Sequence, residues 1–381
     1  MAVQVTNYQC PTCTGPLRFD GAAGKLVCDY CDGRYDAAEI EALYADKDKA
    51  AQEAQAVQEA KKAQQSKTRT EGVEDDWDLA HAGGQWSEAE AAHIRVYTCP
   101  SCSAEIICDE NTAATSCAYC GNPTVVPGML GGALKPDLVI PFKLDKDAAI
   151  AALKTYYKGK LFLPKEFSTQ NALDEIKGVY VPFWLFDCRS SGMAEFSGEK
   201  SRTYRSGDYR VTETSHFRLY RSGKVAFEKV PVDASTKMPD EHMDAIEPFD
   251  YSEIKPFSTA YLPGFLADKY DQDSKTCATR ADTRIEASMI DTLAETVTGY
   301  SGVSVNDKHI ALQRGKVSYA LLPVWMLTTR WKDKPFTFAM NGQTGKLVGN
   351  LPVSAKRFLA WMFGIAAPMT ALALAYFFLL S

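Results

Sequence analysis

Eight of the 11 cysteines fall into two blocks with the same spacing. Each block has two Cys-x-x-Cys pairs separated by 14 residues, with proline inside the first pair and tyrosine inside the second. The two-residue spacing lets both sulfurs of a pair reach one ion, and two pairs then complete a tetrahedral four-thiolate site. The predicted zinc ligands are Cys10, Cys13, Cys28 and Cys31 in the first block, and Cys99, Cys102, Cys117 and Cys120 in the second.

Both blocks are too short to bury a hydrophobic core of their own, and domains of this size usually need disulfides or a bound metal ion for stability. A bound structural zinc supplies on the order of 10–16 kcal/mol of apparent folding energy. A closed four-cysteine site leaves no open coordination position, so we expect two structural Zn²⁺ ions rather than catalytic ones. Disulfides are the alternative, but no signal peptide follows Met1, and this favours reduced thiols. Cys108, Cys188 and Cys277 fall outside the spacing and are interpreted as core or surface residues.

Other candidate chemistry is weak. Residues 342–347, GQTGKL, resemble a phosphate-binding loop, but two residues separate the glycines where four are needed, and this favours a hairpin turn. Asp240, His242, Asp244 and Glu247 form a polar cluster that fits a capped acidic turn better than a metal site. No nucleophile with its base is recognisable. We therefore expect no enzyme activity and no catalytic or cofactor-binding residues apart from the metal ligands.

A basic stretch covers residues 200–229, where eight basic residues stand against three acidic ones with aromatic residues between them. The simplest interpretation is a solvated hairpin face. Contact with anionic lipid is one alternative. Binding of single-stranded nucleic acid is the other, because interleaved aromatic and basic side chains suit stacked bases and phosphates.

The segment between the cysteine blocks has a different composition. Residues 37–68 are rich in Ala, Gln, Glu and Lys and contain no Gly or Pro, which predicts a solvated helical spacer, with a weak coiled coil or partner-docking helix as the alternative. Residues 69–94 carry an acidic tract and the pair Gly83-Gly84, and predict a flexible linker. Trp77 and Trp86 are candidate docking anchors or caps of the neighbouring cysteine block.

The C-terminal segment is apolar. Residues 358–380 contain no charge over 23 positions, and as a helix they would be about 34 Å long, enough for a hydrocarbon core of about 30 Å. Lys356 and Arg357 precede the segment and only Ser381 follows it. The positive-inside rule then predicts a single-pass, tail-anchored protein of the cell inner membrane, with the bulk of the chain in the cytoplasm.

The body, residues 128–357, predicts a mixed α+β fold with internal duplication. Val181-Pro-Phe-Trp-Leu185 matches Leu322-Pro-Val-Trp-Met326, and each is followed by a Gly-Lys segment and a Pro-Val pair. We expect helices about 145–158 and 279–298, and hairpins about 221–224 and 341–345.

Composition agrees with several units rather than a disordered or multi-span chain. The net charge is -6, the hydrophobic fraction is 46%, and the acidity is concentrated in residues 36–78. The expected class is α+β, with two small β zinc ribbons, a helical linker, the duplicated body and one transmembrane helix. The expected units are ribbon 1 (1–36), the helical then acidic flexible linker (37–94), ribbon 2 (95–127), the body (128–357, with half-repeats of about 136–235 and 276–355) and the transmembrane helix (358–380).

Together these features resemble bacterial tail-anchored double zinc-ribbon proteins of the transcription-factor-IIB ribbon type, a family often labelled primosomal protein or replication helicase through the ribbon alone. The segments Val230–Ser235, Glu247–Asp250, Tyr261–Phe265 and Asn341–Gly345 carry the resemblance beyond the ribbons. Thr14 and Ser103 depart from it, since many ribbons have glycine directly after the first cysteine pair. The chain has no helicase nucleotide site.

The expected function is that of a non-enzymatic, membrane-anchored scaffold on the cytoplasmic face, whose ribbons recruit a peripheral protein partner. The resemblance implies phage-shock-protein-A-like and flotillin-like partners of a membrane-stress response, beside the lipid bilayer. The alternative is a nucleic-acid-binding membrane tether that uses the ribbons and the basic segment 200–229.

Overall fold

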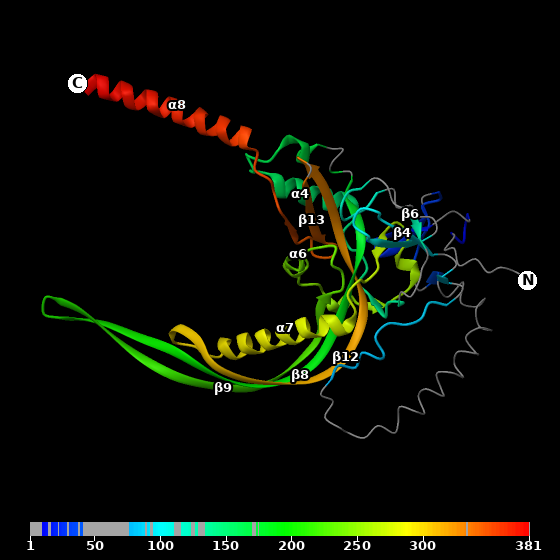
Figure 1. The fold of residues 1–381 in the computed structure, drawn as a ribbon, viewed down its shortest axis with the longest axis horizontal. Helices are drawn as coiled ribbons and strands as arrows, with labels where there is room; N and C mark the ends of the chain where they lie inside the picture. The colour runs from blue at the N-terminus through cyan, green and yellow to red at the C-terminus, as the bar shows by residue number, and fades with distance from the viewer. Residues whose placement is uncertain are drawn as a thin grey trace, which may run out of the picture.

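The computed structural model describes residues 10–13, 17–21, 23–28, 30–36, 39–40, 76–87, 90–91, 94–109, 116–122, 126–128, 134–169, 173, 175–332 and 334–380. The predicted helical spacer over 37–68 therefore lies almost entirely outside the described residues. The fold is mixed α+β, as expected from the sequence (Figure 1).

Two sheets contain the strands. A small sheet has the order β1-β2-β3, and an 11-stranded sheet follows the path β10-β7-β12-β8-β11-β5-β4-β6, with β9 beside β8, β13 beside β12 and β14 beside β13. The strands are β1 (Leu17–Asp20), β2 (Lys25–Cys28), β3 (Arg34–Tyr35), β4 (Ile94–Thr98), β5 (Glu105–Asp109), β6 (Val126–Gly128), β7 (Leu138–Val139), β8 (Lys177–Ser206), β9 (Tyr209–Asp233), β10 (Lys255–Pro256), β11 (Leu266–Asp268), β12 (Ser301–Trp331), β13 (Lys334–Asn341) and β14 (Leu347–Gly349). The helices are α4 (Lys146–Tyr157), α6 (Asp240–Ala245), α7 (Ser274–Glu295) and α8 (Ala355–Leu380), with short 3-10 turns η2 (Lys165–Ser168), η3 (Tyr251–Glu253) and η4 (Thr259–Tyr261).

Strands β8 and β12 form the centre of the body. They pair antiparallel from Lys177↔Met326 to Glu199↔Ser301, with three register irregularities. At 30 and 31 residues they far exceed the usual strand of about 5–6 residues. Each strand is buried at one end and exposed at the other. The buried ends contain the Pro-Trp segments Val181–Leu185 and Leu322–Met326, and the exposed ends extend beyond the body.

The topology contains two similar units, each a short strand, a helix, a long strand and a further strand. β7, α4, β8 and β9 make the first, and β11, α7, β12 and β13 make the second. The short strands are exchanged between the units: β7 pairs in parallel with β12, and β11 pairs in parallel with β8. This arrangement agrees with the duplication read from the Pro-Trp segments, while the exact limits of the half-repeats stay a prediction.

The exchange is repeated in side-chain hydrogen bonds. The Trp184 indole of the first unit donates to the Gln272 carbonyl of the second, at 2.9 Å. The Trp325 indole of the second donates to the Leu144 carbonyl of the first, also at 2.9 Å. Each acceptor directly precedes the aspartate that caps a helix: Asp145 accepts from the backbone of α4, and Asp273 accepts from that of α7.

Beyond the body, β8, β9 and β12 continue as a three-stranded arm (Figure 1). Helix α7 packs along one face of the arm through residues four apart, of which Met289 and Leu293 reach furthest out. Gly192 and Gly223 are directly opposed beneath it. A Cβ at Gly192 would lie 3.2 Å from the Met289 Cε, so the two glycines let the helix approach the strands closely.

The hairpin expected about Arg221–Lys224 is wrong. Residues 209–233 form one continuous strand, and the turn lies earlier, at the two-residue loop Gly207-Asp208 between the paired residues Ser206 and Tyr209. Gly207 has φ 61°, a value that glycine adopts without strain. Gly223, which suggested the turn, is instead a strand residue under α7.

Segment 76–87, expected within a flexible linker, lies on the body. The Trp77 ring is buried against Phe186, with centroids 4.8 Å apart, and its indole donates to Asp282 at 3.1 Å. Trp86 packs edge-on against Phe257 at 5.8 Å. Both tryptophans are therefore anchors to the body rather than caps of a ribbon.

Helix α8 covers the predicted apolar segment and projects from the body (Figure 1). Its base is fixed, because the Phe162 ring lies 5.4 Å from Phe358 and 5.6 Å from Trp361, and Ser354 donates to the Phe162 carbonyl. Among the described residues, no helix has the length and apolarity that a membrane crossing requires, so the transmembrane helix expected over 358–380 is not supported by the structure.

The exchanged indoles make a stability prediction. Trp184→Phe and Trp325→Phe should each lower the free energy of unfolding by about 1 kcal/mol or more, because each leaves a partly buried carbonyl without its donor. Chemical denaturation followed by circular dichroism would measure both. Trp361→Phe, on an exposed position of α8, is the control and should stay within about 0.5 kcal/mol of the parent. A large loss in one exchanged tryptophan and none in the other would contradict the equivalence of the units.

Candidate metal centres

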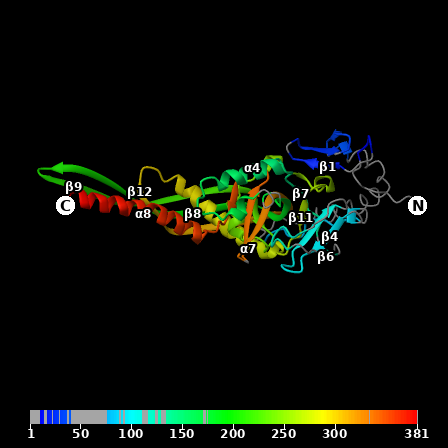
Figure 2. The same cartoon turned by 90° about the horizontal axis from the view of Figure 1, so that it is seen from above.

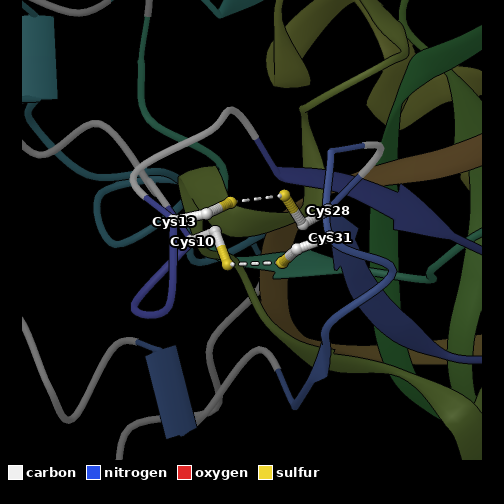
Figure 3. Close-up of side chains that lie close together, drawn as sticks. All are labelled: Cys10, Cys13, Cys28 and Cys31. Atoms are coloured by element: carbon white, nitrogen blue, oxygen red, sulfur yellow. Dashed lines mark hydrogen bonds between the residues drawn. The ribbon is translucent and has the colours of Figure 1, made fainter.

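The structure brings each predicted set of four cysteines together (Figure 3 shows the first). In the first set, the Sγ atoms of Cys10 and Cys31 are 3.4 Å apart, as are those of Cys13 and Cys28. In the second set, the corresponding two separations are 3.6 Å. In each set all four sulfur atoms lie within 4.8 Å of one another. Each set can therefore hold one metal ion.

The distances fit a tetrahedral thiolate site and not disulfides. Zn–S bonds of about 2.3 Å place tetrahedral sulfurs about 3.8 Å apart, close to the separations seen here. Sulfurs joined in a disulfide would lie at about 2.05 Å, and none of the 11 cysteines, all of them described, forms a disulfide. In the part of the chain that the structure describes, no other group of three or more metal-type ligands is this close.

Local backbone turns explain how the cysteine pairs hold their sulfurs. The carbonyl of Cys99 accepts from the Ser103 N–H at 2.8 Å, and that of Cys117 accepts from Gly121 at 3.1 Å. Cys28 accepts from Asp32 in the same way. The donor residue is left-handed each time, with φ of 56°, 66° and 55°, a region that glycine favours. Ser103 thus keeps the turn without the glycine; Thr14 lies outside the described residues.

The sulfurs of the first set influence one another's protonation. Burial raises the pKa of Cys10, but hydrogen bonds from the Tyr35 hydroxyl and the Thr12 and Cys13 backbone outweigh it and lower the pKa to about 6. The Gly33 N–H lowers the pKa of Cys31, yet the neighbouring Cys10 and Cys13 sulfurs raise it to about 12. One thiolate therefore suppresses ionisation of the others. A divalent cation among the sulfurs would remove that repulsion.

Tyr35 supports the first set and was missed by the sequence analysis. Its hydroxyl lies 3.3 Å from the Cys10 Sγ and 2.6 Å from the Thr12 hydroxyl. Strand β3 carries Tyr35 and pairs with β2, which brings the ring back over the first cysteine pair. The only sequence signal is an aromatic residue four positions after the last ligand, which is too common to be specific.

The second ribbon is built into the body. Its strand β5 pairs with β11 of the main sheet, at Ile106↔Asp268 and Ile107↔Ala267. On the other side, β12 reaches the second cysteine pair: the Thr328 hydroxyl lies 3.0 Å from the Ala118 carbonyl, and Arg330 donates to the Cys120 carbonyl. Thr328 and Arg330 are more than 200 residues from these carbonyls, so no local pattern predicts the contact.

The first ribbon packs on the body without joining its main sheet: Phe19 and Leu26 lie in the same buried cluster as Phe142, while β1, β2 and β3 form a separate sheet. The Phe19 N–H of β1 donates to the Pro263 carbonyl at 3.2 Å, and the Phe19 ring lies 5.4 Å from Tyr261. The equivalent tyrosines of the two ribbons, each just before the last cysteine, have opposite surroundings. Tyr119 is 5% exposed, and burial beside the Asp268 carboxylate raises its pKa. Tyr30 is 78% exposed.

One curated relative was found. The uncharacterized protein YdjG of Bacillus subtilis is 35% identical over 319 aligned residues, which cover 71% of this chain and 94% of the relative. The chain belongs to the YdjG family. No protein-family model matches it, and no solved structure does.

The three cysteines of this YdjG-family chain that lie outside the two ligand sets are buried in the fold. Burial raises the pKa of Cys188 to about 11 and that of Cys277 to about 12, and Cys108 is buried as well. Such thiols are poor nucleophiles at neutral pH.

The acidic cluster about α6 forms ion pairs with α7. Arg280 contacts Asp240 at 3.0 Å and Asp244 at 2.7 Å, and Arg284 contacts Glu247 at 2.6 Å. His242 is buried in the same helix. These pairs agree with the predicted acidic turn and disagree with a metal site.

The two metal centres of the YdjG-family chain should differ in their effect on stability. Elemental analysis should find two metal ions per chain, and Cys10→Ser and Cys99→Ser should each leave one. Cys99→Ser should also destabilise the body by about 3 kcal/mol or more, because β5 is paired with β11. Cys10→Ser should destabilise the body less, because the first ribbon packs on the core but shares no strand pairing with the main sheet. Equal destabilisation by both variants in calorimetry would contradict the difference in attachment.

Proposed function

We propose that the chain is a non-enzymatic scaffold at the cytoplasmic face of a membrane, and that its first ribbon recruits a peripheral protein partner. Each four-cysteine set holds a structural Zn²⁺, since four thiolates in a closed tetrahedral arrangement are typical of zinc and leave no position for substrate. The finer resemblance to tail-anchored double zinc-ribbon proteins belongs to this proposal.

The contrast between Tyr30 and Tyr119 carries the proposal. Both tyrosines occupy the same position of the same motif, yet the body covers only the second. An exposed tyrosine on a turn held by a metal site offers a rigid aromatic anchor, the kind of residue that dominates protein interfaces. The second ribbon is paired with the main sheet through β5, and the body covers its tyrosine. The first ribbon is therefore the one that can bind a partner.

Membrane attachment is proposed through α8. From Phe358 to Leu372 every side chain is exposed, among them Leu359, Trp361 and Phe363. Soluble proteins rarely expose an apolar surface of this size, and where they do it usually contacts a membrane or another protein. By resemblance, the partner is a phage-shock-protein-A-like or flotillin-like protein, and the setting is a membrane-stress response.

The recruiting role is tested by Tyr30→Ala. The variant should keep two zinc ions and should lose capture of the purified phage-shock-protein-A-like or flotillin-like protein from the same cell, because the anchor is removed and the fold is not. Tyr220→Ala, which removes an exposed tyrosine of the arm, is the matched control and should retain capture. Capture that survives Tyr30→Ala but is lost in the control would place the partner on the arm and defeat the proposal.

Membrane attachment is tested by removing residues 358–381. The full chain should float with vesicles and resist extraction by carbonate, whereas the shortened chain should move to the soluble fraction, since it lacks the apolar surface of α8. Carbonate-sensitive but salt-resistant binding of the full chain would indicate a helix lying in the interface rather than across it. A shortened chain that stays on vesicles of neutral lipid would rule out α8 as the anchor.

A further inference from the structure

The tip of the arm has a surface that neither the metal centres nor the ribbons use. Strand β12 ends its pairing at Ser301↔Glu199, so residues 200–215 form a two-stranded ribbon without cover on either face. All of these residues except Val211 are exposed, and four basic residues stand against two acidic ones.

The two faces of the tip differ in chemistry. On the face shared with α7 lie Tyr204 and Tyr209, which are 43% and 77% exposed. The other face has two hydroxyl pairs, Ser201–Thr214 at 3.0 Å and Thr203–Thr212 at 3.1 Å, followed by a third pair, Arg205↔Arg210. Side chains alternate between faces along a strand, so the tyrosines and this arginine pair are on opposite sides.

The arginine pair has no anionic partner within the described part of the chain: no ion pair involves Arg205 or Arg210. Like charges placed directly opposite one another in a sheet are destabilising. An external anion between them would remove this cost, and the neighbouring hydroxyls offer it further hydrogen bonds.

The position of the tip relates it to the proposed membrane helix. Both views place the arm tip and the end of α8 at the same end of the long axis, with the ribbons β1 and β4 at the other (Figures 1 and 2). The direction of α8 is fixed at its base, where Phe162 packs on Phe358 and Trp361 and the Arg357 guanidinium donates to the Leu163 carbonyl. A membrane that binds the end of α8 would therefore also lie near the arm tip.

We propose that the arm tip binds the anionic headgroups of a lipid surface, with Arg205 and Arg210 on the phosphates and Tyr204 and Tyr209 at the boundary with the acyl chains. Interfacial tyrosine and basic residues near a surface are typical of such contacts. A nucleic acid fits less well, because a strand lying on the tyrosine face would meet Arg202 but would leave the pair Arg205 and Arg210 on the opposite face without a phosphate. A surface entered end-on meets both faces. The inference rests on the proposed membrane attachment only for the direction of approach.

The test uses the full chain with an environment-sensitive fluorescent amino acid in place of Ser206, and flotation measured in the same samples. Vesicles of phosphatidylcholine alone are compared with vesicles containing about one third phosphatidylglycerol. The emission should shift to the blue only in the anionic vesicles. In Arg205→Gln/Arg210→Gln the ratio of bound to free tip should fall about 25-fold, about 5-fold for each basic residue.

Controls separate the tip from the rest of the arm. Arg218→Gln/Lys224→Gln removes the same charge nearer the body and should keep the blue shift, and a probe at Met193 should not shift in either vesicle. Two bound zinc ions per chain verify the fold of every variant.

The outcomes distinguish this inference from the proposed function. A chain that floats with vesicles while the tip probe stays silent overturns the tip contact and leaves α8 attachment intact. A shift in anionic vesicles that persists after removal of residues 358–381 supports the tip contact and shows that it does not depend on α8. A shift produced by single-stranded DNA and not by anionic vesicles would assign the tip to nucleic acid and overturn the inference.

Discussion

The antiparallel ladder between β8 and β12 supports every other part of the molecule. Its inner part holds the exchanged short strands β7 and β11, and through β11 it holds the second ribbon. Its outer part becomes the arm. The exchanged indole bonds of Trp184 and Trp325 fix each helix start to the strand of the other unit, so neither unit can complete its core alone. Loss of the metal from the second ribbon, which is joined to this ladder through β11, should therefore destabilise the whole body.

The two ribbons show how one motif can have two different surroundings. Their ligand spacing is identical and the three cysteine turns that the structure describes share the same hydrogen bond, so the difference lies in the surroundings and not in the metal site. The second ribbon contributes strand β5 and its cysteine-pair carbonyls to contacts with the body. The first touches the body along β1 and leaves its Tyr30 turn open.

Local chemistry could be read from the sequence, and long-range packing could not. The ligand sets follow from two-residue spacings, the start of α4 from a capping aspartate at 145, and the turn at 341–345 from its Asn-Gly composition. Arg221-Ser-Gly-Lys224 has an equally good turn composition, but packing under α7 makes it strand, and that helix lies some 60 residues further on. The supports of the second centre, Thr328 and Arg330, are likewise brought in only by the finished sheet.

The long axis separates the two kinds of surface that the proposals use. The ribbons lie at one end, and α8 and the arm tip at the other (Figure 2). A single apolar helix would hold the molecule at one point only, and the molecule could still rotate about the axis of that helix. A second contact at the arm tip removes that freedom, since two points separated by the width of the molecule define its orientation. With both contacts made, the open Tyr30 turn faces away from the membrane, where a peripheral partner can reach it.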